Sequence, residues 1–99
     1  HYLHAFPHAG RAWTLRSLGR IPEAVQSGQR AVDLLTEALG ADHGVTLTVR
    51  GELGVALVEA GWLSEAEPHL RAALNGDLSE VPPDDRRDME AALAEIEAQ

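Results

Sequence analysis

Two stretches, LRSLGRIPEA at residues 15–24 and LVEAGWLSEA at residues 57–66, decide how this chain folds. A shift of 42 residues places the first on the second, with Leu, Gly, Glu and Ala at matching positions. Beyond the two stretches, the same shift superimposes Ala31 on Ala73 and His1 on His43. Such self-similarity is the signature of a repeat architecture. Because His1 falls inside the repeat pattern, we expect the chain to be a piece of a longer protein.

The second unit predicts two helices joined by a glycine turn. Apolar residues recur at intervals of three and four over residues 45–60, which predicts a helix with one apolar stripe. We expect Asp42 to cap this helix and Gly61 to end it in a left-handed conformation. The expected stripe consists of Val49, Leu53, Ala56, Leu57 and Ala60.

The second helix of this unit is predicted for about residues 64–75. Ser64 and Glu67 have the spacing of a capping box, in which the two side chains satisfy backbone donors at the helix start. Pro68 falls within the first turns, where its missing N–H removes at most one hydrogen bond, and Gly76 ends the helix.

The first unit follows the same plan. Its first helix begins within residues 3–7 and ends just before Gly19. Pro22, which suits the first turn of a helix, opens a second helix that runs to about Leu39 and stops at Gly40.

We therefore expect one all-α domain over residues 1–99. It contains repeat 1 at about residues 3–39, repeat 2 at about 45–75, a linker at 76–82 and a capping helix at 83–98. The last helix has a narrow apolar stripe, and its other faces are charged. The end of a helical stack requires this pattern, because the last helix must cover an apolar surface without exposing another. The stripe consists of Met89, Ala92, Leu93 and Ile96, and the acids Asp84 and Asp85 lie at the positive end of the helix dipole.

Composition excludes several classes of function. The chain has no cysteine, which excludes disulfides and thiolate chemistry. Its basic residues are all arginines, and its net charge of −8 has the wrong sign for binding nucleic acid. No apolar run approaches the length of about 18 residues that a membrane span needs. These features predict a soluble, intracellular and cytoplasmic protein that binds neither nucleic acid nor membrane.

The helix pairs resemble the tetratricopeptide repeat. The residues that carry this resemblance span about residues 5–75. They are Ala12, Leu15, Gly19, Ile21, Glu23, Ala24, Ala31 and Val32 in the first unit, and Leu53, Gly54, Leu57, Gly61, Leu63, Glu65, Ala66, Leu70, Ala73 and Leu74 in the second. The 42-residue period and the tract at residues 39–47 are similar to the longer repeats of kinesin light chains and bacterial regulators. The first unit departs from the family pattern at Arg11 and Gly28, where larger apolar residues are usual. The absence of lysine is typical of high-GC genomes and indicates an actinobacterial source.

The resemblance implies a right-handed superhelix of two helix pairs plus a cap, with a concave groove that binds a peptide or a partner protein. The residues implied to face this groove are Phe6, Ala9, Gly10, Trp13, Arg16, Ser17, Thr48, Gly51, Glu52, Val55, Val58 and Glu59. Apolar contact would come from Phe6, Trp13, Val55 and Val58, and Arg16 would meet a carboxylate of the partner. Gly51 and Glu52 replace the residues that clamp a terminal carboxylate in chaperone-binding members. A second interpretation stays open, in which Phe6 and Trp13 pack against a preceding repeat.

No residue pattern predicts a reaction or a cofactor. His1, His4 and His8 have a spacing that could hold a metal, but no acid or cysteine lies nearby to complete the ligand set. His43 is expected to hold its loop by a hydrogen bond to the backbone. We therefore predict a non-catalytic protein-binding module within a larger regulatory protein. The alternative is a structural arm that forms a homodimer through the exposed face of the N-terminal repeat.

Overall fold

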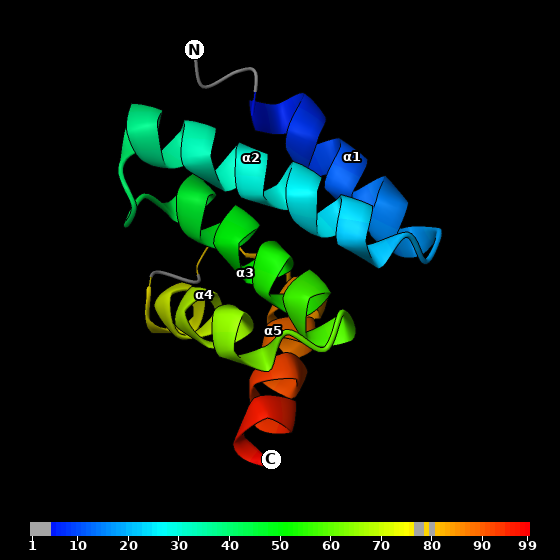
Figure 1. The fold of residues 1–99 in the computed structure, drawn as a ribbon. Coiled ribbons are helices and arrows are strands. Elements are labelled where there is room, and N and C mark those ends of the chain that lie inside the picture. Colours follow the sequence, from blue (N-terminus) through cyan, green and yellow to red (C-terminus); the bar gives the residue numbers. More distant parts are fainter. Residues whose placement is uncertain (1–4, 77–78, 80) are drawn as a thin grey trace.

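The computed structural model describes residues 5–76, 79 and 81–99, and within them the chain is built from helices alone. Each helix packs against the next one in the sequence (Figure 1). They are α1 (Ala5–Ser17), α2 (Ile21–Leu39), α3 (Gly44–Glu59), α4 (Leu63–Asn75) and α5 (Pro83–Glu97). The predicted all-α class, two helix pairs followed by a capping helix, is confirmed.

The turns inside the two helix pairs have the same geometry. Gly19 and Gly61 take positive φ angles of 79° and 83°, which glycine adopts without steric cost. In each turn the N–H of the glycine bonds three residues back, and the N–H of the following residue bonds five residues back. This pair of bonds is the Schellman motif, which satisfies carbonyl groups at the end of a helix. The 42-residue sequence shift therefore corresponds to a structural repeat.

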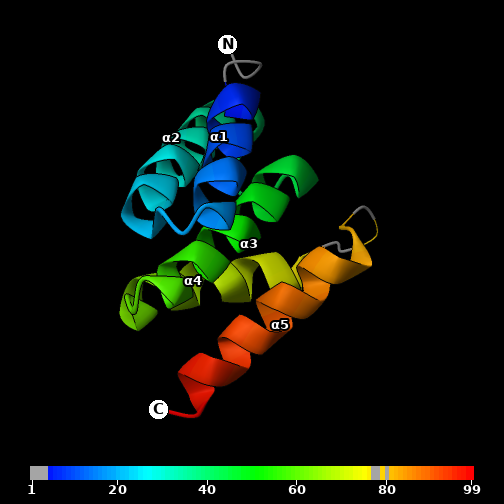
Figure 2. The same ribbon diagram turned by 90° about the vertical axis from the view of Figure 1, so that its right-hand side faces the viewer.

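Helix α3 lies at the centre of the molecule, between α2 on one side and α4 and α5 on the others (Figure 2). The predicted stripe residues Val49, Leu53, Ala56 and Leu57 are buried, but the expectation of a single stripe is wrong, because buried residues surround most of the circumference of α3. Val55 and Val58, for example, lie outside that stripe and are only 8% and 7% exposed. The repeat pattern did not show that α5 covers this face of α3.

Small residues let the helices approach α3 closely. A methyl group on Gly54 would lie 2.6 Å from Cγ of Leu70 on α4, and the side chain of Met89 on α5 covers Gly51. Gly28, which departs from the family pattern, packs under Leu53 of α3. These glycines therefore belong to the seams between helices, where an added methyl group would overlap a neighbour at Gly51 and Gly54 and would be tight at Gly28.

Two of the predicted helix caps differ in the structure. His43, not Asp42, caps α3, and its Nδ1 accepts a hydrogen bond from the N–H of Val45 at 3.2 Å. The structural role expected for His43 is therefore confirmed. The capping box of Ser64 is absent, because α4 begins at Leu63 and places Ser64 inside its first turn. Glu67 instead pairs with Arg71 at 3.0 Å, one turn further along α4.

The capping helix α5 buries a narrow face. Met89 is fully buried and Ala92 is 6% exposed, while Leu93 and Ile96 are partly buried against the core. Pro82 stands at its N-cap, and Asp84 and Asp85 occupy its first turn. Of the predicted linker 76–82, residues 77, 78 and 80 lie outside the described residues. None of the helices described is both long enough and apolar enough to cross a membrane.

Candidate functional site

An open groove runs between α1 and the first half of α3, with a volume of about 480 Å³. Trp13 is the most exposed aromatic residue on it, at 62%, and Phe6 is 46% exposed. The groove is lined by Phe6, Ala9, Gly10 and Trp13 from α1 and by Gly44, Val45, Thr48, Val49 and Glu52 from α3. The structure thus brings together six of the residues predicted to face the groove, namely Phe6, Ala9, Gly10, Trp13, Thr48 and Glu52.

Helical periodicity explains why these side chains share one groove. Residues three and four apart lie on the same face of a helix, and the groove residues of both α1 and α3 follow that spacing. Val45 and Val49 belong to this face as well, although the resemblance did not point to them. Val49 lies three residues before Glu52 and Val45 lies four residues before Val49, and this spacing was the signal in the sequence that could have identified them.

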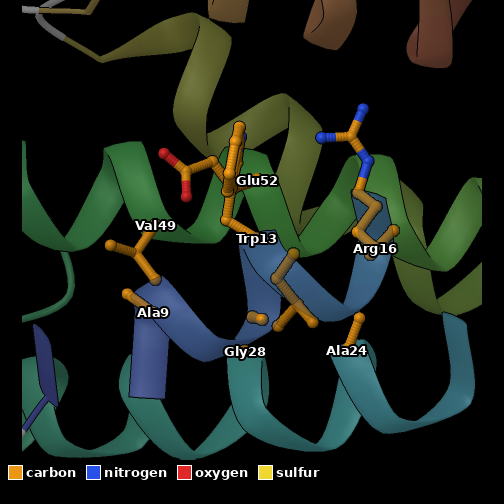
Figure 3. Close-up of a pocket in the computed structure, with 10 residues that line it drawn as sticks. Ala9, Trp13, Arg16, Ala24, Gly28, Val49 and Glu52 are labelled. Carbon is orange, nitrogen blue, oxygen red and sulfur yellow. The ribbon is translucent and has the colours of Figure 1, made fainter. Parts of the chain in front are cut away.

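Beneath the groove, small side chains leave a narrow hollow between α1, α2 and α3 (Figure 3). Its volume is about 20 Å³, which is room for about one water molecule. Ala9 and Ala12 from α1 and Ala24 and Gly28 from α2 form part of its wall. Trp13, Arg16 and Glu52 line it too, and Trp13 and Glu52 are shared with the groove above.

Arg16 is held by acids of its own chain. Its Nε lies 2.6 Å from Oε1 of Glu59, and its Nη2 lies 3.9 Å from Oδ2 of Asp88. Glu59 was expected to line the groove, whereas the sequence analysis did not connect Asp88 with the site. This geometry does not favour the expected role of Arg16, because a carboxylate from a partner would have to compete with two that are already in place.

Glu52 is the most perturbed acid of the site. Burial and, to a smaller extent, the nearby charge of Asp85 raise the pKa of its carboxyl from 4.5 to about 7, against the opposing effect of Arg16. Burial and the charge of Asp88 also raise the pKa of Asp85. Within residues 5–76, 79 and 81–99, the Glu52 carboxylate has neither a hydrogen-bond donor nor an ion-pair partner. It therefore forms a polar point in an otherwise largely apolar groove.

The other residues predicted for the groove lie outside the groove between α1 and α3. Val55, Val58 and Gly51 lie under α5, so the apolar contact expected from the two valines is corrected to a role in the core. The hydroxyl of Ser17 donates a hydrogen bond to the carbonyl of Trp13, one turn earlier in α1.

A second depression lies between α2 and α4, on a different face of the stack from the α1/α3 groove. Val25 and Leu57 form its apolar floor, and polar residues such as Gln29 surround it. His69 lies at its edge and accepts a hydrogen bond from Nε of Arg50 at 3.2 Å. Burial and the positive charge of Arg50 lower the pKa of His69. This pairing gives His69 a structural role.

Metal binding finds no support in the part of the chain that the structure describes. No three His, Cys, Asp or Glu side chains gather there in a way that could hold a metal ion. Of the three histidines considered for a metal, His1 and His4 lie outside the described residues, and His8 is half-buried on α1.

Successive antiparallel helix pairs with matching glycine turns and an open groove define an α-helical repeat protein. The family model described as tetratricopeptide repeat matches residues 7–79. The chain therefore belongs to the tetratricopeptide repeat family, as its sequence pattern indicated. Comparison with curated proteins found no match, and comparison with solved structures found none either.

Proposed function

We propose that this chain is a non-catalytic module that binds a peptide segment of a partner protein in the α1/α3 groove. The observation that carries this proposal is the exposure of Trp13 at 62% within a groove that also contains Phe6. In this proposal the module serves a larger regulatory protein in the cytoplasm. Repeats of this family commonly mediate contacts between proteins, which agrees with such a role.

Exposed aromatic side chains supply much of the energy in binding sites. Tryptophan is enriched among the residues whose truncation costs more than about 2 kcal/mol of binding free energy. Val45 and Val49 line the same groove as Trp13, so an apolar side chain bound there would lose contact with water on several sides. The groove is therefore suited to an apolar or aromatic anchor of an extended or helical peptide.

A peptide selection tests this function. Random twelve-residue peptides displayed on phage are selected against the immobilised chain, and the recovered peptides are titrated calorimetrically against the wild type and variants. We expect Trp13→Ala to weaken binding by roughly tenfold or more, as for an aromatic anchor.

Trp62→Ala is the matched control, because Trp62 is also exposed, at 46%, but lies at the start of α4 outside the groove. It should leave affinity unchanged. Recovered peptides that bind equally well to the wild type and to Trp13→Ala would refute the assignment of the groove.

Self-association is the alternative function. It is favoured by a specific observation, which is that Trp13, Phe6 and Leu18 all expose large apolar side chains on or next to the edge helix α1. Light scattering across a hundredfold range of concentration separates the two functions. A constant monomer mass supports the peptide groove, whereas a dimer that Trp13→Ala dissociates would support the structural arm.

A further inference from the structure

The groove combines an exposed aromatic ring with a half-buried acid. Trp13 and Glu52 line both the open groove and the hollow beneath it. In Figure 3 the Glu52 carboxylate and the Arg16 guanidinium lie on either side of the Trp13 ring as seen in that view. Tryptophan attracts a cation to its face, and a neighbouring carboxylate neutralises the charge of that cation.

We propose that the groove recognises a basic side chain of the partner peptide, arginine or lysine, which stacks on Trp13 and pairs with Glu52. This inference rests on the peptide-binding function proposed above and adds the chemistry of the peptide. It also reverses the charge expected for the partner, because the sequence analysis expected a carboxylate of the partner to meet Arg16.

Charge complementarity supports a basic occupant. Two hollows adjoin the end of the groove, and the acids that line them come from α3 and α5. These acids are Glu52, Glu59, Asp85, Asp88 and Glu95. Among the described residues lining these hollows the only cation is Arg16, and Glu59 already pairs with it. An acidic peptide would meet net repulsion here, whereas a basic one is attracted.

The state of Glu52 supports the same occupant. Its half-buried carboxylate has no hydrogen-bond donor or ion-pair partner in the described part of the chain, and burial together with the charge of Asp85 raises its pKa to about 7. A buried charge without a partner is costly, and a bound guanidinium or ammonium would supply that partner. Binding of a cation should therefore favour the ionised carboxylate and become tighter as the pH rises.

The groups around Glu52 define how its pH dependence arises. Arg16 faces it from α1, and Asp85 and Asp88 face it from α5. Glu52 also lines the hollow beneath the groove, to which α2 contributes Ala24 and Gly28. Neither of these two residues carries a charge. Asp85 has a raised pKa of its own, so it would reinforce the effect of Glu52 as it ionises.

The test uses N-acetyl-L-arginine amide as the probe and N-acetyl-L-citrulline amide, its uncharged counterpart, as the control. The indole N–H signals of Trp13 and Trp62 are followed by NMR during titration of the isotope-labelled chain. We expect the arginine probe to shift the Trp13 signal and leave Trp62 in place. The citrulline probe should bind roughly threefold to tenfold more weakly, the range for a cation–π contact with an exposed ion pair.

Glu52→Gln and pH provide the second readout. The variant should keep only the part of the arginine preference that comes from stacking on Trp13, so its preference over citrulline should be smaller than in the wild type. The wild type should bind arginine more tightly at pH 8 than at pH 6. Glu37→Gln, which removes an acid from the exposed face of α2, should behave as the wild type does. Equal shifts of Trp13 by both probes in the wild type would overturn the proposal.

Failure of this inference can be told apart from failure of the peptide-binding function. Phage peptides that require Trp13 but contain no basic residue would leave the groove as a peptide site and refute its preference for a cation. If neither the probes nor the selected peptides depend on Trp13, both proposals fall together.

Discussion

At the scale of single residues, the chemistry of Glu52 is set by helices that are distant in the sequence. Its own helix places it on the groove, Arg16 comes from α1 and Asp85 comes from α5. Burial and the negative charge of Asp85 outweigh the attraction of Arg16, so the pKa of Glu52 rises to about 7. An acid with this pKa changes its charge near neutral pH, where an ordinary glutamate stays ionised.

This shift makes the stability of the chain depend on pH at Glu52. The pKa in the folded state lies above the ordinary value of 4.5, so between pH 4.5 and about 7 the folded state holds the proton more tightly. The contribution of Glu52 to the free energy of unfolding therefore falls as the pH rises through this window. We expect Glu52→Gln to be more stable than the wild type by about 1–3 kcal/mol at pH 8, with a smaller difference at pH 5.

Urea denaturation at both pH values measures this difference, with Glu37→Gln as the control for loss of an exposed acid. The control should change the free energy of unfolding by less than about 0.5 kcal/mol at either pH. A Glu52→Gln difference that is the same at pH 5 and pH 8 would contradict the raised pKa.

At the scale of helices, the seam between α3 and α4 depends on Gly54. A methyl group there would lie 2.6 Å from Cγ of Leu70, a fully buried residue of α4. The intrinsic preference of a helix for alanine over glycine is about 1 kcal/mol, whereas overpacking a core costs about 1–3 kcal/mol. The packing term is therefore expected to exceed the helix propensity term.

We expect Gly54→Ala to lower the free energy of unfolding by about 1–2 kcal/mol in urea denaturation. Gly10→Ala on α1 is the matched control, because no atom lies within 4 Å of its added methyl group. The control should gain about 0.5–1 kcal/mol from the lower entropy of its unfolded state. Stabilisation by both substitutions would mean that Leu70 moves aside without cost.

Local sequence signals predicted the ends of the helices well where a glycine terminates the helix. They predicted the starts of helices less well where several neighbouring residues could serve as the N-cap. Gly19, Gly40 and Gly61 end or follow helices with positive φ angles, and this property depends on a few adjacent residues. The caps of α3 and α4 were mispredicted by one or two residues, because several neighbouring residues could act as caps. The choice there depends on the geometry of the whole loop.

At the scale of the whole molecule, α5 completes the core that the second helix pair leaves open. Met89 is fully buried, and its side chain covers Gly51 on α3. Ala92 of α5 belongs to the same core cluster as Val55 and Val58. The last helix therefore contributes to the folding of α3 and α4 rather than only shielding them from water.

Met89→Ala tests this contribution. We expect it to lower the free energy of unfolding by about 2–5 kcal/mol, the cost of a cavity in a packed core, as measured by far-UV circular dichroism in urea. Met89→Leu preserves most of the volume and should cost less than about 1.5 kcal/mol. A loss below 0.5 kcal/mol for Met89→Ala would show that α5 contributes little to the core.

The sequence by itself determined the repeat, the all-α class and the membership of the tetratricopeptide repeat family. The resemblance to that family also implied that Phe6, Trp13, Thr48 and Glu52 face one groove, and these four residues do line the groove between α1 and α3. Only the tertiary structure decided that Val55 and Val58 are buried, that Arg16 is held by Glu59, and that Glu52 lies close to Asp85. The physical reason is that periodicity shows which face of a helix is apolar, whereas the packing of distant helices decides what covers that face and which charges meet there.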